Sequence, residues 1–218
     1  MPETRSDRAV MFADLAGFTA LTEAHGDEDA VAVTFRFTAL GNDVLVGTTR
    51  IVKTMGDAIM FTADSVGDAV DTGIALLRAV DAEPSFPGVR IGLHSGDMVE
   101  HDGDVYGATV NLAARVAEQA RSGQLLTTEV GARALDHRDD VHAFELGEFD
   151  FKHIARPVAI FAVEGVGGAE ATGTLDPVCH MVIDEDTAPA RLPFGGQEYY
   201  FCSLECARVF IEAPDLYT

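Results

Sequence analysis

The chain has no tryptophan, only three cysteines and only two lysines among its 218 residues. Three cysteines are too few for a disulfide framework, and their odd number favours free thiols or a metal site. Apolar runs such as Val158–Val163 are short, whereas a helix needs about 20 apolar residues to cross a bilayer. The charged start, Met1–Arg8, has no signal-peptide pattern. We therefore expect a cytoplasmic protein without a membrane span.

Positive charge is scarce overall. Lysine and arginine total 15 residues against 36 aspartates and glutamates, which gives a formal net charge of −21. A field of that sign repels nucleic acid and anionic membranes, so we expect neither as a partner. The apolar share of 47% is sufficient for a packed core. The length suits one ordinary domain plus a small appendage.

The hydrophobic patterns predict the order strand, helix, hairpin, helix, hairpin, helix. This order is typical of an α+β sandwich in which helices cover a largely antiparallel sheet. The predicted elements are a strand at Val10–Ala13, a helix from Asp27 to about Leu45, a hairpin of Ile51–Val52 with Ala58–Phe61, a helix at Ser65–Val80, a strand at Val89–Leu93, a strand at Met98–Glu100 that pairs with what precedes it, and a helix from Gly107 to about Ala120.

Two carboxylates stand where a metal–phosphate site needs them. Asp14 ends the first predicted strand, and Asp57 lies in the turn of the first hairpin. Carboxylates at a strand end and a neighbouring hairpin tip can hold Mg²⁺ against phosphate oxygens. Gly17 provides a turn into a helix, where free backbone N–H groups suit a phosphate. Taken singly, an aspartate in a turn is more often only a turn former.

A second polar group lies on the last predicted helix. Asn111 and Arg115 are four residues apart, so their side chains leave the same helix face. An arginine reinforced by an amide suits the stabilisation of a charged phosphoryl transition state. Asp104 precedes this helix. The alternative is a surface arginine with a capping aspartate nearby.

Three segments together resemble the signatures of the class III adenylate and guanylate cyclase catalytic domain. They are Phe12–Thr19 (FADLAGFT), Lys53–Asp57 (KTMGD) and Asp104–Arg115 (DVYGATVNLAAR). Three ordered motifs with matched spacings are far more specific than a single glycine-rich match. The resemblance implies a ferredoxin-like cyclase sandwich, with the catalytic domain at residues 1–164.

The resemblance also implies roles for the matched positions. The ribose 3′-OH of the nucleotide attacks the α-phosphate and expels pyrophosphate, with two Mg²⁺ or Mn²⁺ ions in each active site. The implied set is the metal ligands Asp14, Leu15 and Asp57, the phosphate-binding residues Gly17, Phe18, Thr19 and Lys152, the base-reading pair Lys53 and Asp104, and the catalytic residues Asn111 and Arg115.

The base-reading pair favours ATP over GTP. Lys53 only donates and adenine N1 accepts, whereas ionised Asp104 only accepts and the adenine amino group donates. In this family each active site is shared between two subunits. A chain that carries all the required residues is therefore expected to form a homodimer.

The C-terminal end carries all three cysteines. Asp176–Met181 and Tyr199–Phe210 resemble the small YHS (TRASH-type) module associated with heavy-metal handling. Cys202 and Cys206 are one helical turn apart and can share Zn²⁺ or Cu⁺ with Cys179. His180 replaces the family's usual glycine, and two roles stay open for it: a fourth ligand or a solvent-facing residue. The alternative for the cysteines is a small fold with buried free thiols.

The sequence thus predicts an adenylate cyclase that converts ATP to 3′,5′-cyclic AMP, followed by a flexible glycine-rich linker at 165–174 and a regulatory YHS-like metal-binding domain at 175–218. Two other functions remain open. One is a catalytically inactive cyclase-like domain that binds nucleotide or dimerises. The other is a metal sensor or metal-handling protein in which such a domain is an accessory. The intact positions Asp14, Asp57 and Arg115 favour the enzyme.

Overall fold

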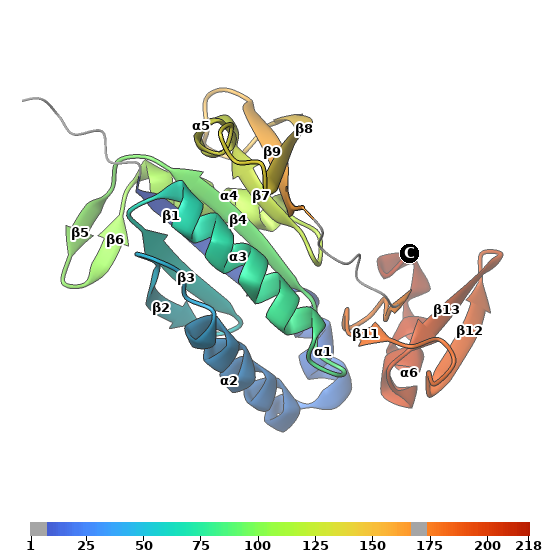
Figure 1. The fold of residues 1–218 in the computed structure, drawn as a ribbon. Coiled ribbons are helices and arrows are strands. Elements are labelled where there is room, and N and C mark those ends of the chain that lie inside the picture. The colour runs from blue at the N-terminus through green and yellow to red at the C-terminus, as the bar shows by residue number, and fades with distance from the viewer. Residues whose placement is uncertain (1–7, 167–173) are drawn as a thin grey trace, which may run out of the picture.

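A computed structural model describes residues 8–166 and 174–218 (Figure 1). Its main sheet has seven strands in the order β2-β3-β1-β4-β7-β9-β8. Only β4 and β7 are parallel, so the sheet is mixed and largely antiparallel, as the sequence predicts. The strands are β1 (Ala9–Leu15), β2 (Arg50–Met55), β3 (Ala58–Ala63), β4 (Val89–Ser95), β7 (Leu125–Thr128), β8 (Val141–Phe149) and β9 (Val158–Gly165).

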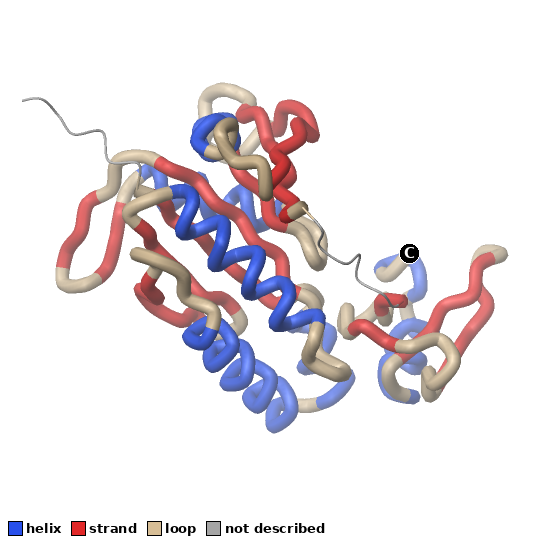
Figure 2. Tube along the Cα trace, in the orientation of Figure 1, coloured by secondary structure: helices blue, strands red, loops and turns tan. Residues whose placement is uncertain are grey.

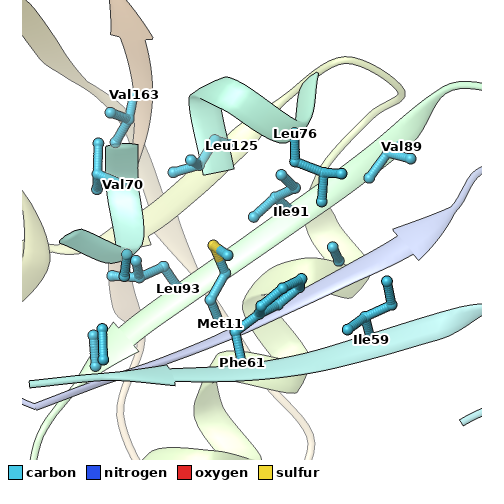
Figure 3. Close-up of a cluster of buried hydrophobic side chains, with 14 of the residues drawn as sticks. Met11, Ile59, Phe61, Val70, Leu76, Val89, Ile91, Leu93, Leu125 and Val163 are labelled. Atoms are coloured by element: carbon cyan, nitrogen blue, oxygen red, sulfur yellow. The ribbon is translucent and has the colours of Figure 1, made fainter. Parts of the chain in front are cut away.

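Helices cover both faces of this sheet because the central strand β1 is apolar on both sides. Met11 packs with Leu76 in one buried cluster (Figure 3). Val10 and Phe12 point the other way and pack with Ala113 in another. Two long helices, Asp27–Asp43 and Val66–Asp81, cover the face of the sheet that carries Met11, and Figure 2 shows them side by side. The helices of this domain are α1 (Phe18–His25), α2 (Asp27–Asp43), α3 (Val66–Asp81), α4 (Ala108–Gln119) and α5 (Glu129–Ala134).

Glycine sets how closely α4 approaches the sheet. A Cβ added at Gly92 of β4 would lie 2.0 Å from the backbone nitrogen of Ala117 in α4. No other residue permits that contact, because a side chain would collide with helix backbone rather than with a movable group. The close approach fixes the position of the helix that carries Asn111 and Arg115.

Most predicted elements are confirmed. The β2–β3 hairpin, for example, turns at Gly56, which has a positive φ of 65°. Two features differ from the prediction. The prediction that Met98–Glu100 pairs with the preceding chain is wrong: β5 (Val99–His101) pairs with β6 (Asp104–Tyr106), which follows it. Asp102 and Gly103 both have positive φ and form the tight turn between them. Helix α1 was not predicted, because eight residues are too few to show a clear periodicity.

The C-terminal segment, residues 174–218, forms a small unit that packs against the first domain. Val178 and Phe201 share a buried cluster with Leu21 of α1 and Ala30 of α2. Gly165 ends β9 and Thr174 begins β10, and the part of the predicted linker at residues 167–173 lies outside the described residues. The elements here are β10 (Thr174–Leu175), β11 (Val182–Ile183), β12 (Ala190–Phe194), β13 (Gln197–Phe201) and α6 (Leu204–Glu212).

No helix within residues 8–166 or 174–218 has the length and apolar character needed to cross a bilayer.

Candidate active site

The end of β1 and the tip of the β2–β3 hairpin lie side by side. Asp14 pairs with Ala58 across the two strands, and the Leu15 N–H donates to the Asp57 carbonyl over 3.1 Å. This backbone contact brings together Asp14, Leu15 and Asp57, the three residues predicted to hold divalent ions.

The charges at this point suit a cation. Burial raises the pKa of Asp14, and the negative charge of Asp57 acts in the same direction, while Arg90 opposes both. A divalent ion between the two carboxylates would relieve their repulsion. Hard oxygen donors of this kind are the ligands that Mg²⁺ and Mn²⁺ prefer. The donor set therefore fits the ions that the family resemblance implies.

Arg90 is a site residue that the sequence analysis missed. It pairs with Asp14 across β1 and β4, and its Nε donates to Asp14 Oδ2 over 2.7 Å. The signal in the sequence was a single arginine inside the apolar strand Val89–Leu93. Its neighbour on the adjacent strand could not be known without the strand order.

A cavity of about 480 Å³ opens beside these residues, and we call it the aspartate cavity. The domain that contains the seven-stranded sheet lines one side of this cavity, and this side includes the start of α1. Gly17 there has the left-handed φ of 70° that favours glycine. Because the first N–H groups of a helix lack intrahelical partners, this turn offers donors to an anion. The residues that line it from this side are Leu15, Gly17, Phe18, Thr19, Ala20, Asp57 and Arg90.

The predicted base-reading pair is assembled at the sheet edge. Lys53 lies on β2 and Asp104 on β6, and their side chains form an ion pair of 2.5 Å between Nζ and Oδ2. The hydrogen bond from Lys53 lowers the pKa of Asp104, so its carboxylate stays ionised. Both groups are partly exposed and are free to exchange this contact for a ligand.

The predicted catalytic residues lie in a different cavity. Asn111, Arg115 and Lys152 line a space of about 710 Å³, which we call the Arg115 cavity. Arg115 pairs there with Glu118 at 2.7 Å. The two cavities have no lining residue in common. One chain thus brings Asn111, Arg115 and Lys152 together but does not bring them to Asp57.

The three cysteines form a compact group, the thiol cluster. Cys179 Sγ lies 3.4 Å from Cys202 Sγ, which lies 3.7 Å from Cys206 Sγ. Hydrogen bonds with Cys179 and Cys202 lower the pKa of Cys206. Hydrogen bonds with Cys202 and Cys206, together with burial, raise the pKa of Cys179. Three neighbouring sulfur donors are suited to a soft metal.

His180 does not join this cluster, which corrects one of the two roles left open for it. Its backbone has a positive φ of 59°, and its side chain turns toward Gly17, where an added Cβ would lie 2.5 Å from the His180 ring. His180 instead lines the aspartate cavity. The histidine that meets the sulfur atoms is His25, which the sequence analysis did not single out.

Comparison with known proteins agrees with this geometry. Residues 2–165 match the adenylate and guanylate cyclase catalytic domain, and the chain belongs to that family. Residues 174–218 match the YHS domain, so both resemblances drawn from the sequence are confirmed.

Among curated relatives, a pH-sensitive adenylate cyclase of Mycobacterium tuberculosis is 33% identical over 168 residues, which cover 76% of this chain and 42% of the relative. An adenylate cyclase of Streptomyces griseus is 35% identical over 58% of this chain and 32% of its own length. The matched region thus spans less than half the length of these relatives.

Solved structures show the same fold. Adenylate cyclases from Trypanosoma brucei, studied in their monomeric state, superpose with a TM-score of 0.64 at 24% identity, covering 77% of this chain and 91% of theirs. An adenylyl cyclase from P. aeruginosa gives 0.61 at 23% identity, covering 76% and 96%.

Proposed function

We propose that this chain is an adenylate cyclase that converts ATP to 3′,5′-cyclic AMP and pyrophosphate. The observation that carries this proposal is the backbone contact that joins Asp14 and Asp57 beside the cavity containing Arg90 and the first turn of α1. Two carboxylates, one guanidinium and free helix N–H groups match the needs of a metal-bound triphosphate.

Each group then has a distinct task in the reaction. Bound Mg²⁺ or Mn²⁺ would supply Lewis-acid activation of the ribose 3′-OH and would neutralise charge on the leaving pyrophosphate. Asp14 and Asp57 would hold these ions, and Arg90 with the N–H groups of Gly17–Thr19 would bind phosphate oxygens. The reaction forms the bond between the 3′-oxygen and the α-phosphorus and breaks the bond between the α-phosphorus and the bridging oxygen. The 3′-OH proton passes to solvent, and pyrophosphate leaves. Arg115 stabilises the charge that gathers on the α-phosphate, and Asn111 orients the ribose.

The ion pair between Lys53 and Asp104 supports adenine as the base. These side chains already present a donor and an acceptor 2.5 Å apart. Adenine offers the complementary acceptor at N1 and donor at its amino group, whereas guanine offers the opposite polarity at both points. A guanine base at this position would leave both its own groups and those of Lys53 and Asp104 without hydrogen-bond partners, which disfavours GTP.

The separation of the two cavities supports a homodimer with shared sites. Asp57 lines one cavity, and Asn111 and Arg115 line the other. Chemistry at one α-phosphate needs both sets together. A second copy of the chain, related by a two-fold axis, supplies the missing half to each site and generates two complete sites.

Contacts between the C-terminal segment and the aspartate cavity support a regulatory role for this segment. Pro177, Val178, His180 and residues 216–218 line the aspartate cavity together with Asp57. The Gly88 N–H also donates to the His180 carbonyl over 3.1 Å. We propose that this segment, when docked, restricts the space that the triphosphate needs and so slows the enzyme.

Substrate competition tests the proposed reaction and its specificity. The purified chain is supplied with equal concentrations of ATP and GTP and with Mn²⁺, and the cyclic products are separated by chromatography. The proposal predicts cyclic AMP in excess by about tenfold or more. Equal amounts of cyclic AMP and cyclic GMP would contradict the role of Lys53 and Asp104.

A further inference from the structure

Helix α1 ends beside the thiol cluster. His25 is the last residue of this helix, and Figure 1 shows α1 next to the C-terminal segment. Its Nε2 lies 3.5 Å from Cys202 Sγ and 3.4 Å from Cys206 Sγ. The ligand atoms of His25, Cys179, Cys202 and Cys206 all lie within 4.8 Å of one another. Three of the four residues come from the C-terminal segment and one from the cyclase domain.

Four of the six separations among these atoms match a tetrahedral metal site, and the other two, from Cys179 to Cys206 and to His25, are no more than 4.8 Å. Zinc bonds of about 2.3 Å to sulfur and about 2.0 Å to nitrogen place two sulfur ligands roughly 3.8 Å apart and a sulfur–nitrogen pair roughly 3.5 Å apart. The observed sulfur–sulfur contacts are 3.4 and 3.7 Å. The observed sulfur–nitrogen contacts are 3.4 and 3.5 Å. A single ion at the centre would therefore reach all four atoms with little rearrangement.

The backbone around the cysteines is held in place by other side chains. One oxygen of Asp176 accepts from the Val178 N–H at 2.8 Å, and the other accepts from the Cys202 N–H at 2.7 Å. The Ser203 hydroxyl caps α6 by accepting from the Cys206 N–H at 3.0 Å. These contacts fix two distant segments in one geometry, which is how supporting residues orient metal ligands.

We propose that His25 completes a Cys₃His site for Zn²⁺ and that the bound ion joins the C-terminal segment to the cyclase domain. Three thiolates with one imidazole form a common structural zinc set. The choice of zinc over Cu⁺ follows from the fourth, nitrogen ligand and the tetrahedral spacing. His180 is excluded from the site because its ring faces the aspartate cavity.

The site is coupled to the nucleotide half of the molecule through α1. Phe18 and Thr19 begin this helix and line the aspartate cavity, and His25 ends it. Eight residues of helix are about 12 Å long and form one rigid body. Metal binding therefore holds the C-terminal segment against the cavity. This consequence rests on the proposed cyclase function, whereas the metal site itself does not.

Metal affinity in matched histidine variants tests the site. Full-length wild type, His25→Ala, His180→Ala and the double variant Cys202→Ser with Cys206→Ser are purified anaerobically and titrated with Zn²⁺ against a chromophoric chelator. We expect one Zn²⁺ per chain in the wild type and in His180→Ala. The dissociation constant should rise at least about tenfold in His25→Ala, and the double variant should lose the site. Wild-type affinity in His25→Ala would overturn the proposal.

Co²⁺ substitution keeps the test decisive if a water replaces the imidazole. The visible bands of Co²⁺ report its coordination number and ligands. We expect a tetrahedral thiolate spectrum for wild type and His180→Ala and a clearly altered one for His25→Ala, with unchanged far-ultraviolet circular dichroism in all three. Identical Co²⁺ spectra in wild type and His25→Ala would show that His25 is not a ligand.

Hydrogen exchange tests whether the ion joins the two parts. Zn²⁺ should slow amide exchange in α1 of the wild type as well as in α6, because the ion ties both helices together. In His25→Ala, Zn²⁺ should protect α6 only. Protection confined to α6 in the wild type would contradict a shared site, whatever the cyclase activity of the protein.

Discussion

The Nε2 atom of His25 lies 3.4 Å from the Sγ atom of Cys206, although 181 residues separate them in the chain. One residue ends a helix that begins at the proposed phosphate site, and the other lies in the C-terminal helix α6. This contact joins the C-terminal segment directly to the cyclase domain, so the two parts are connected by more than the chain between them.

Removal of one metal-binding carboxylate should abolish catalysis without unfolding the chain. Asp57→Ala is expected to lower the rate of cyclic AMP formation by at least about 100-fold. The ions lose a ligand in this variant, so they no longer neutralise the charge of the triphosphate as well. Initial rates with Mn²⁺ measure the effect. The matched control is Asp64→Ala, an exposed aspartate beyond the other end of β3, which should keep close to wild-type activity. Similar rates in both variants would contradict the role of Asp57.

Mixing two inactive variants should restore activity if sites are shared. Heterodimers of Asp57→Ala and Arg115→Ala contain one site with both defects and one site with neither. Recovery should reach at most about half the wild-type rate per dimer. Subunit exchange is verified with two different affinity tags. No recovery in proven heterodimers would rule out a site built from two copies.

Reversal of the base-reading polarity should change nucleotide choice. In Lys53→Glu with Asp104→Cys, the donor and the acceptor for adenine are both lost. We expect the ratio of kcat/KM for ATP to that for GTP to fall by about tenfold or more. Competition kinetics measure this ratio, and an unchanged value would refute the assigned pair.

Loss of the thiol site should release the enzyme. Cys202→Ser with Cys206→Ser is expected to have a cyclase rate several-fold above that of Zn²⁺-loaded wild type, because the C-terminal segment no longer holds its place at the aspartate cavity. The comparison uses Mn²⁺ at saturation, so catalytic ions are equal in both. A lower rate in the variant would reverse the proposed direction of regulation, and equal rates would remove it.

Stability should fall in mild acid partly because of His94. Burial lowers the pKa of His94 to about 4 from 6.5. Below pH 6.5 the unfolded chain binds a proton that the folded chain does not, so stability present above 6.5 is lost as pH falls toward 4. From about pH 7 to about pH 5.5 this group costs about 1 kcal/mol. Urea unfolding measures the free energy of unfolding at both pH values. Between them, it should fall by about 1 kcal/mol more in the wild type than in His94→Gln. An equal fall in both proteins would contradict the role of His94.

The position of Asp57 could be predicted from the sequence, whereas the role of Arg90 could not. The hairpin turn at Gly56 and the strand before Asp14 are local patterns, so the two aspartates could be placed on neighbouring elements in advance. Arg90 and His25 could not, because each acquires its role from a partner on another element. Strand order brings Arg90 to Asp14, and the packing of α1 on the C-terminal segment brings His25 to the cysteines. The pairing of β5 with β6 was missed for a local reason: β6 has only three residues, and Val105 is its only buried one.

The central claim is that this chain makes cyclic AMP from ATP at a metal-dependent site. The most direct measurement incubates the purified full-length protein with ATP and either Mn²⁺ or Mg²⁺, over a range of protein concentrations, and identifies the product by mass spectrometry, with Asp57→Ala in parallel. We expect the wild type to form cyclic AMP and pyrophosphate in equal amounts and only with metal, and we expect almost no product from Asp57→Ala. No cyclic AMP from folded, dimeric wild type with either metal would contradict it.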